Sequence, residues 1–199
     1  AKKKLPKLNV KKCDVSKEPE REALFDWAVS NFKDLNILVN NAGIQRMIDF
    51  KKGTADLLNH RAEDGEDEIE VNFRAPVYLT ALCVPHLLKQ KEAAVVNVSS
   101  GLAFYPMPAM PVYCATKAAM HSFSLTLRQQ LEGTPVKVFE LIPPMVDTNL
   151  DKGARKARGQ TYFGITTAEL VKPAMKAFEN DEYEIRVQDP NLANRMGHR

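Results

Sequence analysis

The sequence predicts an α/β fold: a doubly wound parallel β-sheet in a single domain. Short apolar runs rich in β-branched residues alternate with longer segments of helical periodicity along the 199 residues. Runs such as Ile37–Val39 and Val95–Val98 are typical of strands covered on both faces. Strands that alternate with helices in this way indicate a parallel sheet. With 44% hydrophobic residues, the chain is apolar enough to bury a core.

The expected elements follow one another along the whole chain. Strands are expected at Leu8–Cys13, Asn36–Asn40, Ala94–Ser99, Val136–Ile142 and Tyr183–Val187. Helices are expected at Pro19–Asn31, with Ser16 as N-cap, and at Glu63–Gln90, Val112–Leu131 and Thr167–Glu179. The second helix is apolar on nearly all sides, which predicts burial in the core or at a subunit interface. The glycine-containing, basic segment 149–164 is expected to be a lid at the surface.

Charge and composition exclude several function classes. The net charge of +3, from 28 basic and 25 acidic residues, gives no reason to expect a nucleic-acid or membrane partner. The three cysteines and four histidines form no metal-ligand spacing, so we expect no metal site. Scattered cysteines and the lack of a signal peptide or membrane-spanning run favour reduced thiols in a cytoplasmic protein.

Tyr113 and Lys117 form the first candidate pair. They lie four residues apart on an expected helix, so their side chains share one face. A free tyrosine titrates near pH ~10, and a neighbouring ammonium favours the phenolate and lowers that pKa. The pair is therefore a candidate general acid–base device. Taken alone, the spacing favours a half-buried aromatic beside a solvated lysine.

Three further polar groups change that interpretation. Ser100 follows an expected strand at the sheet edge where parallel α/β folds bind ligands, and its hydroxyl can donate to a carbonyl oxygen. The stretch Asn40-Asn41-Ala42-Gly43 ends another strand, and its glycine lets a ligand approach the backbone. Asn72 places an amide inside an apolar helix, where it must find partners. The structural alternatives are a turn serine, a plain loop exit and an amide bonded to a main-chain carbonyl.

The joint order of these motifs resembles the classical short-chain dehydrogenase/reductase family. The order is Asp14 after a strand, NNAG at 40–43, Asn72, VNVSS ending at Ser100, YCATK at 113–117 and PPMVDT at 143–148. The resemblance covers Leu8 to Val187. The stretches NNAGIQR, PVYLTALCVPHL and LIPPMVDTNL look most like a bacterial oxidoreductase branch named for D-alanine transfer to teichoic acid.

The resemblance implies a Rossmann-like fold and a set of catalytic residues. Tyr113 is expected to be the proton donor in reduction and the base in oxidation. Lys117 is expected to lower the Tyr113 pKa and to hold the nicotinamide ribose. Ser100 is expected to polarise the substrate carbonyl. Asn72 is expected to hold a water that connects Lys117 to solvent.

The resemblance also implies an NAD or NADP cofactor, which would supply the hydride. Asp14 is expected to contact the adenine, and Asn40 and Gly43 are expected to line the cofactor cleft. Thr148 is expected to reach the nicotinamide carboxamide. The choice between NAD and NADP stays open.

One part of the family pattern has no counterpart here. The family opens with a strand and a glycine-rich turn that holds the pyrophosphate, whereas the first glycine of this chain is Gly43. The strand expected at Leu8–Cys13 matches the third strand of the family. A βαβ unit needs ~30 residues or more, so we expect a natural segment of roughly 50 residues before residue 1. A modest difference is Pro143-Pro144 where the family has Pro-Gly.

The leading hypothesis is an NAD(P)-dependent oxidoreductase that interconverts a carbonyl and a secondary alcohol. The second is a non-catalytic binding or scaffold protein of the same fold without a pyrophosphate cradle. A third, a nucleotide-sugar epimerase or dehydratase, shares Tyr-x-x-x-Lys, but the NNAG element argues against it. We expect a small-molecule substrate, and a homodimer or homotetramer formed through the helices at 63–90 and 112–131.

Overall fold

The structure is a computed structural model that describes residues 7–54, 67–150, 156, 159–160 and 164–189. Its sheet has four parallel strands in the order β1-β2-β3-β4. The strands are β1 (Ile37–Asn40), β2 (Ala93–Val98), β3 (Val136–Ile142) and β4 (Glu184–Arg186). The helices are α1 (Glu18–Asn31), α3 (Ala75–Leu87), α4 (Pro111–Gln130) and α6 (Thr167–Glu179), with three short helical segments, η1 (Phe50–Lys52), η2 (Glu70–Arg74) and η3 (Gly101–Ala103). The predicted α/β fold with a parallel sheet is confirmed.

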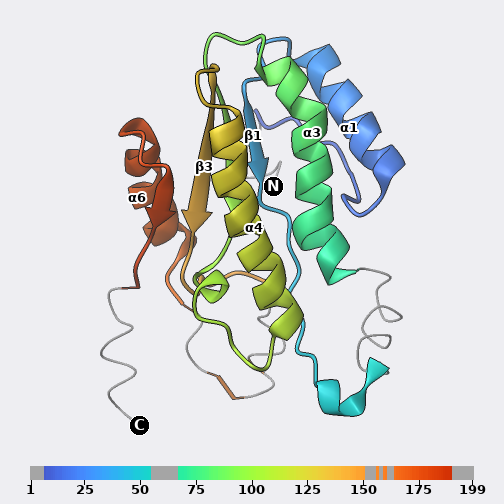
Figure 1. The fold of residues 1–199 in the computed structure, drawn as a ribbon, viewed down its shortest axis with the longest axis vertical. Helices are drawn as coiled ribbons and strands as arrows, with labels where there is room; N and C mark the ends of the chain where they lie inside the picture. Colours follow the sequence, from blue (N-terminus) through green and yellow to red (C-terminus); the bar gives the residue numbers. More distant parts are fainter. Residues whose placement is uncertain (1–6, 55–66, 151–155, 157–158, 161–163, 190–199) are drawn as a thin grey trace.

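The strand register brings all four carboxyl ends to one edge of the sheet. Val39 pairs with Val96 across β1 and β2, and Val96 pairs with Phe139 across β2 and β3. Leu141 of β3 pairs with Ile185 of β4. The strands therefore end together at the lower edge in Figure 1, where the loops that follow β1, β2 and β3 meet the start of α4.

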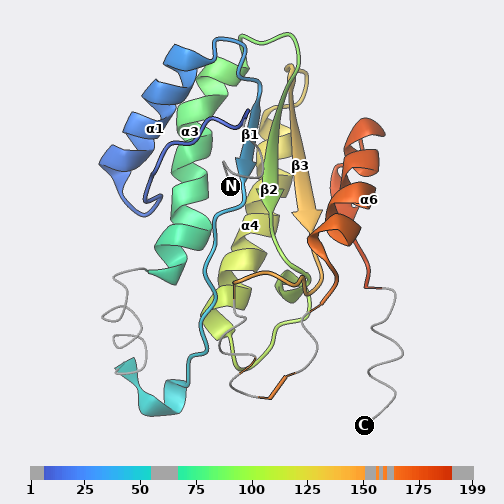
Figure 2. The ribbon, with the colours of Figure 1, turned by 180° about the vertical axis from the view of Figure 1, so that it is seen from behind.

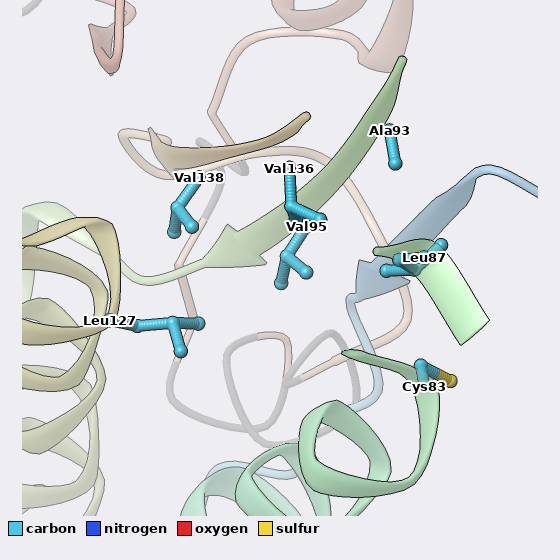
Figure 3. Close-up of a cluster of buried hydrophobic side chains, with 7 residues drawn as sticks. All are labelled: Cys83, Leu87, Ala93, Val95, Leu127, Val136 and Val138. Atoms are coloured by element: carbon cyan, nitrogen blue, oxygen red, sulfur yellow. The ribbon is translucent and has the colours of Figure 1, made fainter. Parts of the chain in front are cut away.

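Helices cover the sheet on both faces. Helices α3 and α4 lie on one face and α6 lies on the other, as the two opposite views show (Figures 1 and 2). The core on the first face is a cluster of side chains from α3, β2, α4 and β3 (Figure 3): Cys83, Leu87, Ala93, Val95, Leu127, Val136 and Val138. On the second face, the buried side chains of Val96, Phe139 and Ile185 pack against α6. Alternate strand residues thus serve opposite faces, as the pleat requires.

The outer edge of β1 pairs with no strand among the described residues. Ile37 and Val39 are 53% and 54% exposed, whereas Leu38 between them packs against the core cluster. Helix α1 packs against α3 at this side of the molecule (Figure 2). The β1 edge is thus the most exposed apolar part of the sheet.

Two sequence predictions near the amino end are wrong. Residues Leu8–Cys13 form no strand, because no described strand lies beside them to accept their backbone hydrogen bonds. Ser16 does not cap α1; the N-cap is Lys17, without a side-chain cap, and the Ser16 hydroxyl donates to Asp14 Oδ1 instead.

The long apolar helix is described from residue 68 onward and changes character along its length. It opens as a turn of α-helix, continues as the π-helical η2 and becomes α3 at Ala75. Residues 63–66, where the helix was expected to begin, lie outside the described residues, as does most of the segment 149–164 expected to be a lid. No helix in the described part of the chain is long and apolar enough to span a membrane.

The core packing predicts the effect of shortening Leu87, which is 1% exposed. We expect Leu87→Ala to lower the free energy of unfolding by about 2–5 kcal/mol, because it leaves a cavity between α3 and the sheet. Leu88→Ala is the matched control, because Leu88 is 40% exposed and is expected to change stability by less than about 1 kcal/mol. Urea unfolding of both variants measures the difference. Equal losses would contradict the assignment of Leu87 to the core.

Candidate active site

The candidate site lies at the carboxyl edge of the sheet, where parallel α/β folds bind ligands. The stretch Asn40–Gly43 leaves β1 there, and Ser100 follows β2 after one intervening residue. Helix α4 begins at the same edge and carries Tyr113 in its first turn (Figure 1). Three separate segments of the chain therefore supply the polar groups of one site.

Ser100 acts on the side chain of Tyr113. The Ser100 hydroxyl lowers the pKa of the Tyr113 phenol by hydrogen bonding, and Tyr113 is only 6% exposed. Ser100 is 8% exposed and caps η3, because its Oγ accepts the backbone N–H of Leu102 at 3.1 Å. That bond uses one lone pair of the Ser100 hydroxyl and leaves its single proton to donate elsewhere.

Burial controls the protonation of Tyr113. The pKa of Tyr113 is raised to about 12, mainly by desolvation; the hydrogen bond with Ser100 lowers this pKa, and the carboxylate of Glu68 adds to the rise. Burial therefore shifts this pKa in the direction opposite to the one predicted from the neighbouring ammonium. At neutral pH the phenol is protonated and able to donate a proton.

Lys117 is an ammonium held inside the protein. Its side chain is 5% exposed, and Nζ donates to the backbone oxygen of Val98, the last residue of β2, at 2.9 Å. Nζ also lies 5.6 Å from the centre of the Tyr113 ring. Burial lowers the pKa of Lys117 to about 8. The lysine is thus mostly charged at neutral pH, but loses its proton far more easily than a surface lysine.

Asn72 and Glu68 together clamp the loop that follows β1. The Asn72 amide accepts the N–H of Ile44 and donates to its carbonyl, both at 2.8 Å. One turn earlier, Glu68 Oε1 accepts the N–H of Arg46 at 3.0 Å. Asn72 also donates to Thr116 Oγ1 on α4 at 3.3 Å. Asn72 lies in the π-helical η2, a geometry frequent at functional sites, and its side chain ties η2, the loop and α4 together.

Gly43 sits directly beside these groups. A Cβ at position 43 would lie 3.3 Å from Asn72 Oδ1 and 3.7 Å from Lys117 Nζ. The lack of a side chain therefore keeps space beside the buried ammonium. The structure brings Gly43, Asn72, Ser100, Tyr113 and Lys117 together, as the sequence predicted for one site.

Asn40 lies at the same edge but is engaged in the core. Its Nδ2 donates to Thr80 Oγ1 at 3.1 Å and to Asn97 Oδ1 at 2.8 Å, and Asn97 in turn donates to Ser124 Oγ at 3.0 Å. This buried chain of hydrogen bonds links α3, β1, β2 and α4. Asn40 therefore holds the strand ends in place beneath the site.

Asp14 and Thr148 are not bonded to this cluster. Asp14 belongs to the start of α1, where its carboxylate accepts from Ser16 and pairs with Lys17 at 3.2 Å. The bonds from Ser16 lower the pKa of Asp14. Thr148 lies half-buried in the loop after β3, and its Oγ1 accepts the N–H of Leu150 at 3.4 Å. Their expected contacts with a cofactor stay predictions.

Sequence reasoning missed several buried polar residues. Glu68 and Glu140 are 5% and 0% exposed, and Asn97 is 0% exposed. Charged residues in a helix or strand normally indicate a solvated face, so pattern alone does not predict their burial. For Glu68, the available signal was its position four residues before Asn72, which puts both on one helix face. Among the described residues, no cluster of three metal-ligating side chains occurs.

The parallel sheet and the arrangement of these residues point to the short-chain dehydrogenase/reductase class of proteins. The family model for short chain dehydrogenases matches residues 1–159, and the chain belongs to this family. The resemblance drawn from the sequence motifs is thereby confirmed.

Relatives narrow the position of the chain within the family. The oxidoreductase DltE of Bacillus subtilis (strain 168) is 55% identical over 185 residues, which cover 93% of this chain and 71% of DltE. This match confirms the predicted branch. The 3-oxoacyl-[acyl-carrier-protein] reductase FabG of Thermotoga maritima is 30% identical over 167 residues, covering 83% of this chain and 63% of FabG. A solved structure of serine dehydrogenase complexed with NADP+ has a TM-score of 0.72 at 27% identity and covers 89% of this chain and 73% of that chain.

The cost of burying the Lys117 ammonium predicts that the protein becomes more stable when this lysine is replaced by an apolar residue. A pKa lowered from 10.5 to about 8 corresponds to about 3 kcal/mol of penalty for the charged form at neutral pH, against about 1 kcal/mol for the bond to Val98. We expect Lys117→Met to raise the free energy of unfolding at pH 7 by about 1–2 kcal/mol, as measured by urea unfolding.

The pH dependence has a definite sign. Between about pH 8 and 10.5 the unfolded chain binds more protons at this lysine than the folded one, so the stability of the native protein rises with pH. The difference in the free energy of unfolding between Lys117→Met and the native protein should therefore become smaller over this pH range. Lys137→Met is the control, because Lys137 is exposed and paired with Asp181, and a change within about 0.5 kcal/mol is expected. A destabilised Lys117→Met would refute the burial penalty.

Proposed function

We propose that this protein is an NAD(P)-dependent oxidoreductase that interconverts a carbonyl and a secondary alcohol, with Tyr113 as the general acid and base. The observation that carries this proposal is the buried phenol of Tyr113, on whose pKa the buried Ser100 hydroxyl acts, with the buried ammonium of Lys117 5.6 Å from the centre of its ring. Two hydroxyl donors that converge at the carboxyl edge of a parallel sheet suit a carbonyl oxygen on which charge develops.

In reduction, Tyr113 donates its hydroxyl proton to the substrate oxygen, while Ser100 donates a hydrogen bond to that oxygen. In oxidation, the Tyr113 phenolate accepts the alcohol proton. The ammonium of Lys117 stabilises the phenolate by charge. Glu68 acts in the opposite direction, because its carboxylate raises the Tyr113 pKa and thus favours the protonated acid. The nicotinamide cofactor supplies or accepts the hydride when bound.

The space beside Gly43 suits a cofactor in contact with Lys117. A Cβ at position 43 would make van der Waals contact with Lys117 Nζ at 3.7 Å, so the lack of a side chain leaves room beside the ammonium. Lys117 and Tyr113 would hold the ribose hydroxyls, with Asn40 and Gly43 at the cleft. We propose the adenine contact for Asp14 and the carboxamide contact for Thr148. Solved relatives have been described in complex with NAD and with NADP.

We propose, further, that two copies associate through the exposed face of η2 and α4. A groove there is lined by apolar and small side chains: Phe50, Ile69, Phe73, Pro111, Val112, Ala115, Thr116 and Ala119. Phe50 and Ile69 are 58% and 55% exposed. Ala115, Ala118 and Ser122 present a further exposed, narrow stripe on α4 that allows close helix packing.

Tyr113→Phe tests the catalytic assignment. The variant removes the only proton that Tyr113 can transfer, so turnover is expected to fall by about 10²-fold or more, whereas cofactor affinity stays nearly unchanged. The assay follows oxidation of NADH and NADPH by absorbance with ethyl acetoacetate, diacetyl and an aldose as carbonyl substrates. Cofactor binding is measured separately by the fluorescence of the reduced nicotinamide.

Tyr183→Phe is the matched control, because Tyr183 stacks on Phe139 away from the site and keeps that contact as phenylalanine. Comparable turnover by Tyr113→Phe and the native protein would refute the role of Tyr113. A native protein that binds neither reduced cofactor would favour the scaffold alternative. Purification with NAD that does not exchange would favour the epimerase or dehydratase alternative.

The association proposal is tested by Ala119→Arg. Ala119 lines the groove and is half-buried, so a guanidinium there is expected to block close packing of a second copy. Light scattering at micromolar concentration should show a dimer or tetramer for the native protein and a smaller species for the variant. Gln130→Arg, at the exposed end of α4, is expected to leave the mass unchanged. A monomeric native protein would rule out the association.

A further inference from the structure

A hydrogen-bonded pair of a histidine and a buried glutamate lies one helical turn beyond Lys117. Glu140 of β3 is 0% exposed, and its Oε2 accepts from Nδ1 of His121 on α4 at 2.7 Å. The other carboxylate oxygen meets no hydrogen-bond donor among the described residues. Burying a carboxylate whose hydrogen bonds are incomplete lowers the stability of the fold. Packing alone therefore does not explain why Glu140 occupies this position.

The pair belongs to a row of polar contacts that fix α4 on the sheet. Along α4, Lys117 donates to Val98 O, Ser124 accepts from Asn97 and Arg128 donates to Val138 O at 2.9 Å. His121 lies between Lys117 and Ser124 in this row. His121 lies four residues after Lys117 and eight after Tyr113 on α4. A contact that fixes His121 against β3 therefore also fixes the position of Tyr113 and Lys117 along the helix axis relative to the strand ends.

His121 also contacts the turn that carries Ser100. The imidazole packs edge-to-face against the ring of Phe104, with 4.6 Å between the two ring centres. Phe104 has a second neighbour, the guanidinium of Arg186 at the end of β4, whose Cζ lies 4.4 Å from the centre of the Phe104 ring. Phe104 closes η3, and its N–H donates to Gly101 O at 3.1 Å. The turn is thus held at its start by the Ser100 cap and at its end by Phe104.

We propose that Glu140 and His121 are positioning residues that set the Ser100 hydroxyl relative to the Tyr113 phenol. His121 acts on both partners, on Tyr113 through the register of α4 and on Ser100 through Phe104. Glu140 orients the imidazole by accepting a hydrogen bond from its Nδ1–H group. The inference rests on the proposed function for its effect on turnover, whereas the order of the Ser100 turn can be measured without any activity.

The test is the double variant Glu140→Leu/His121→Leu. Apolar residues of similar size at both positions of a buried pair typically preserve or raise stability, so the fold is expected to survive. Loss of positioning is expected to lower kcat by about tenfold to a hundredfold, with KM and cofactor affinity nearly unchanged. Glu140→Gln keeps an acceptor for His121 and is expected to retain most of kcat. Turnover is measured with whichever carbonyl of the panel above gives the highest native kcat/KM.

A second measurement does not depend on enzymatic activity. Mass spectrometry follows the rate of backbone hydrogen exchange in the peptide of residues 99–105, which contains the Ser100 turn. The double variant is expected to exchange this peptide several times faster than the native protein. Phe104→Leu, which keeps the hydrogen-bonded pair and removes the ring contact, is expected to do the same and covers the case in which the double variant does not fold. Arg128→Met is the control, because it removes a contact of α4 with β3 at the far end, and it should leave kcat and the peptide unchanged.

The outcomes separate this inference from the proposed function. Unchanged exchange in both the double variant and Phe104→Leu would overturn the positioning role, as would an unchanged kcat in a folded double variant. If Arg128→Met loses as much kcat as the double variant, the pair only holds α4 on the sheet, and the specific positioning role is overturned. A native protein without turnover would refute the oxidoreductase proposal, and faster exchange would still support positioning of the Ser100 turn.

Discussion

The arrangement of this site depends on one hydrogen bond, from Lys117 Nζ to the backbone oxygen of Val98. It fixes the first turns of α4 on the last residue of β2 and buries an ammonium that would prefer water. Burial makes the lysine costly to the fold and easy to deprotonate. The same bond sets Tyr113, one turn earlier, at the carboxyl edge of the sheet. The catalytic role proposed for Lys117 and a structural contact therefore involve the same atom, Nζ.

Around this bond the site is built from side chains that bind backbone. Asn72 and Glu68 hold the loop after β1 by its N–H and C=O groups, and Ser100 caps its own turn. Such contacts tie irregular segments to rigid elements without filling the cleft with side-chain bulk. Gly43 completes this arrangement, because its missing Cβ leaves the space between the Asn72 amide and the lysine.

The sequence predicted the later strands, the main helices and the residues that meet in the site, because strand pattern and motif order are local signals. It failed at Leu8–Cys13, since a strand also needs a neighbour that the pattern of one segment does not reveal. It failed on the direction of the Tyr113 pKa, which burial in three dimensions controls. It missed Glu140 and His121, because residues 19 apart in sequence meet only through the packing of α4 on β3.

The chain of buried amides and hydroxyls beneath the site has a consequence for the way in which the protein opens. Thr80, Asn40, Asn97 and Ser124 join α3, β1, β2 and α4 through side-chain hydrogen bonds. Moving any one of these elements away leaves a buried donor or acceptor unpaired, which costs about 1–3 kcal/mol for each group. The four elements therefore open as one cooperative unit, and the backbone amides at the ends of β1 and β2 share one level of protection against hydrogen exchange.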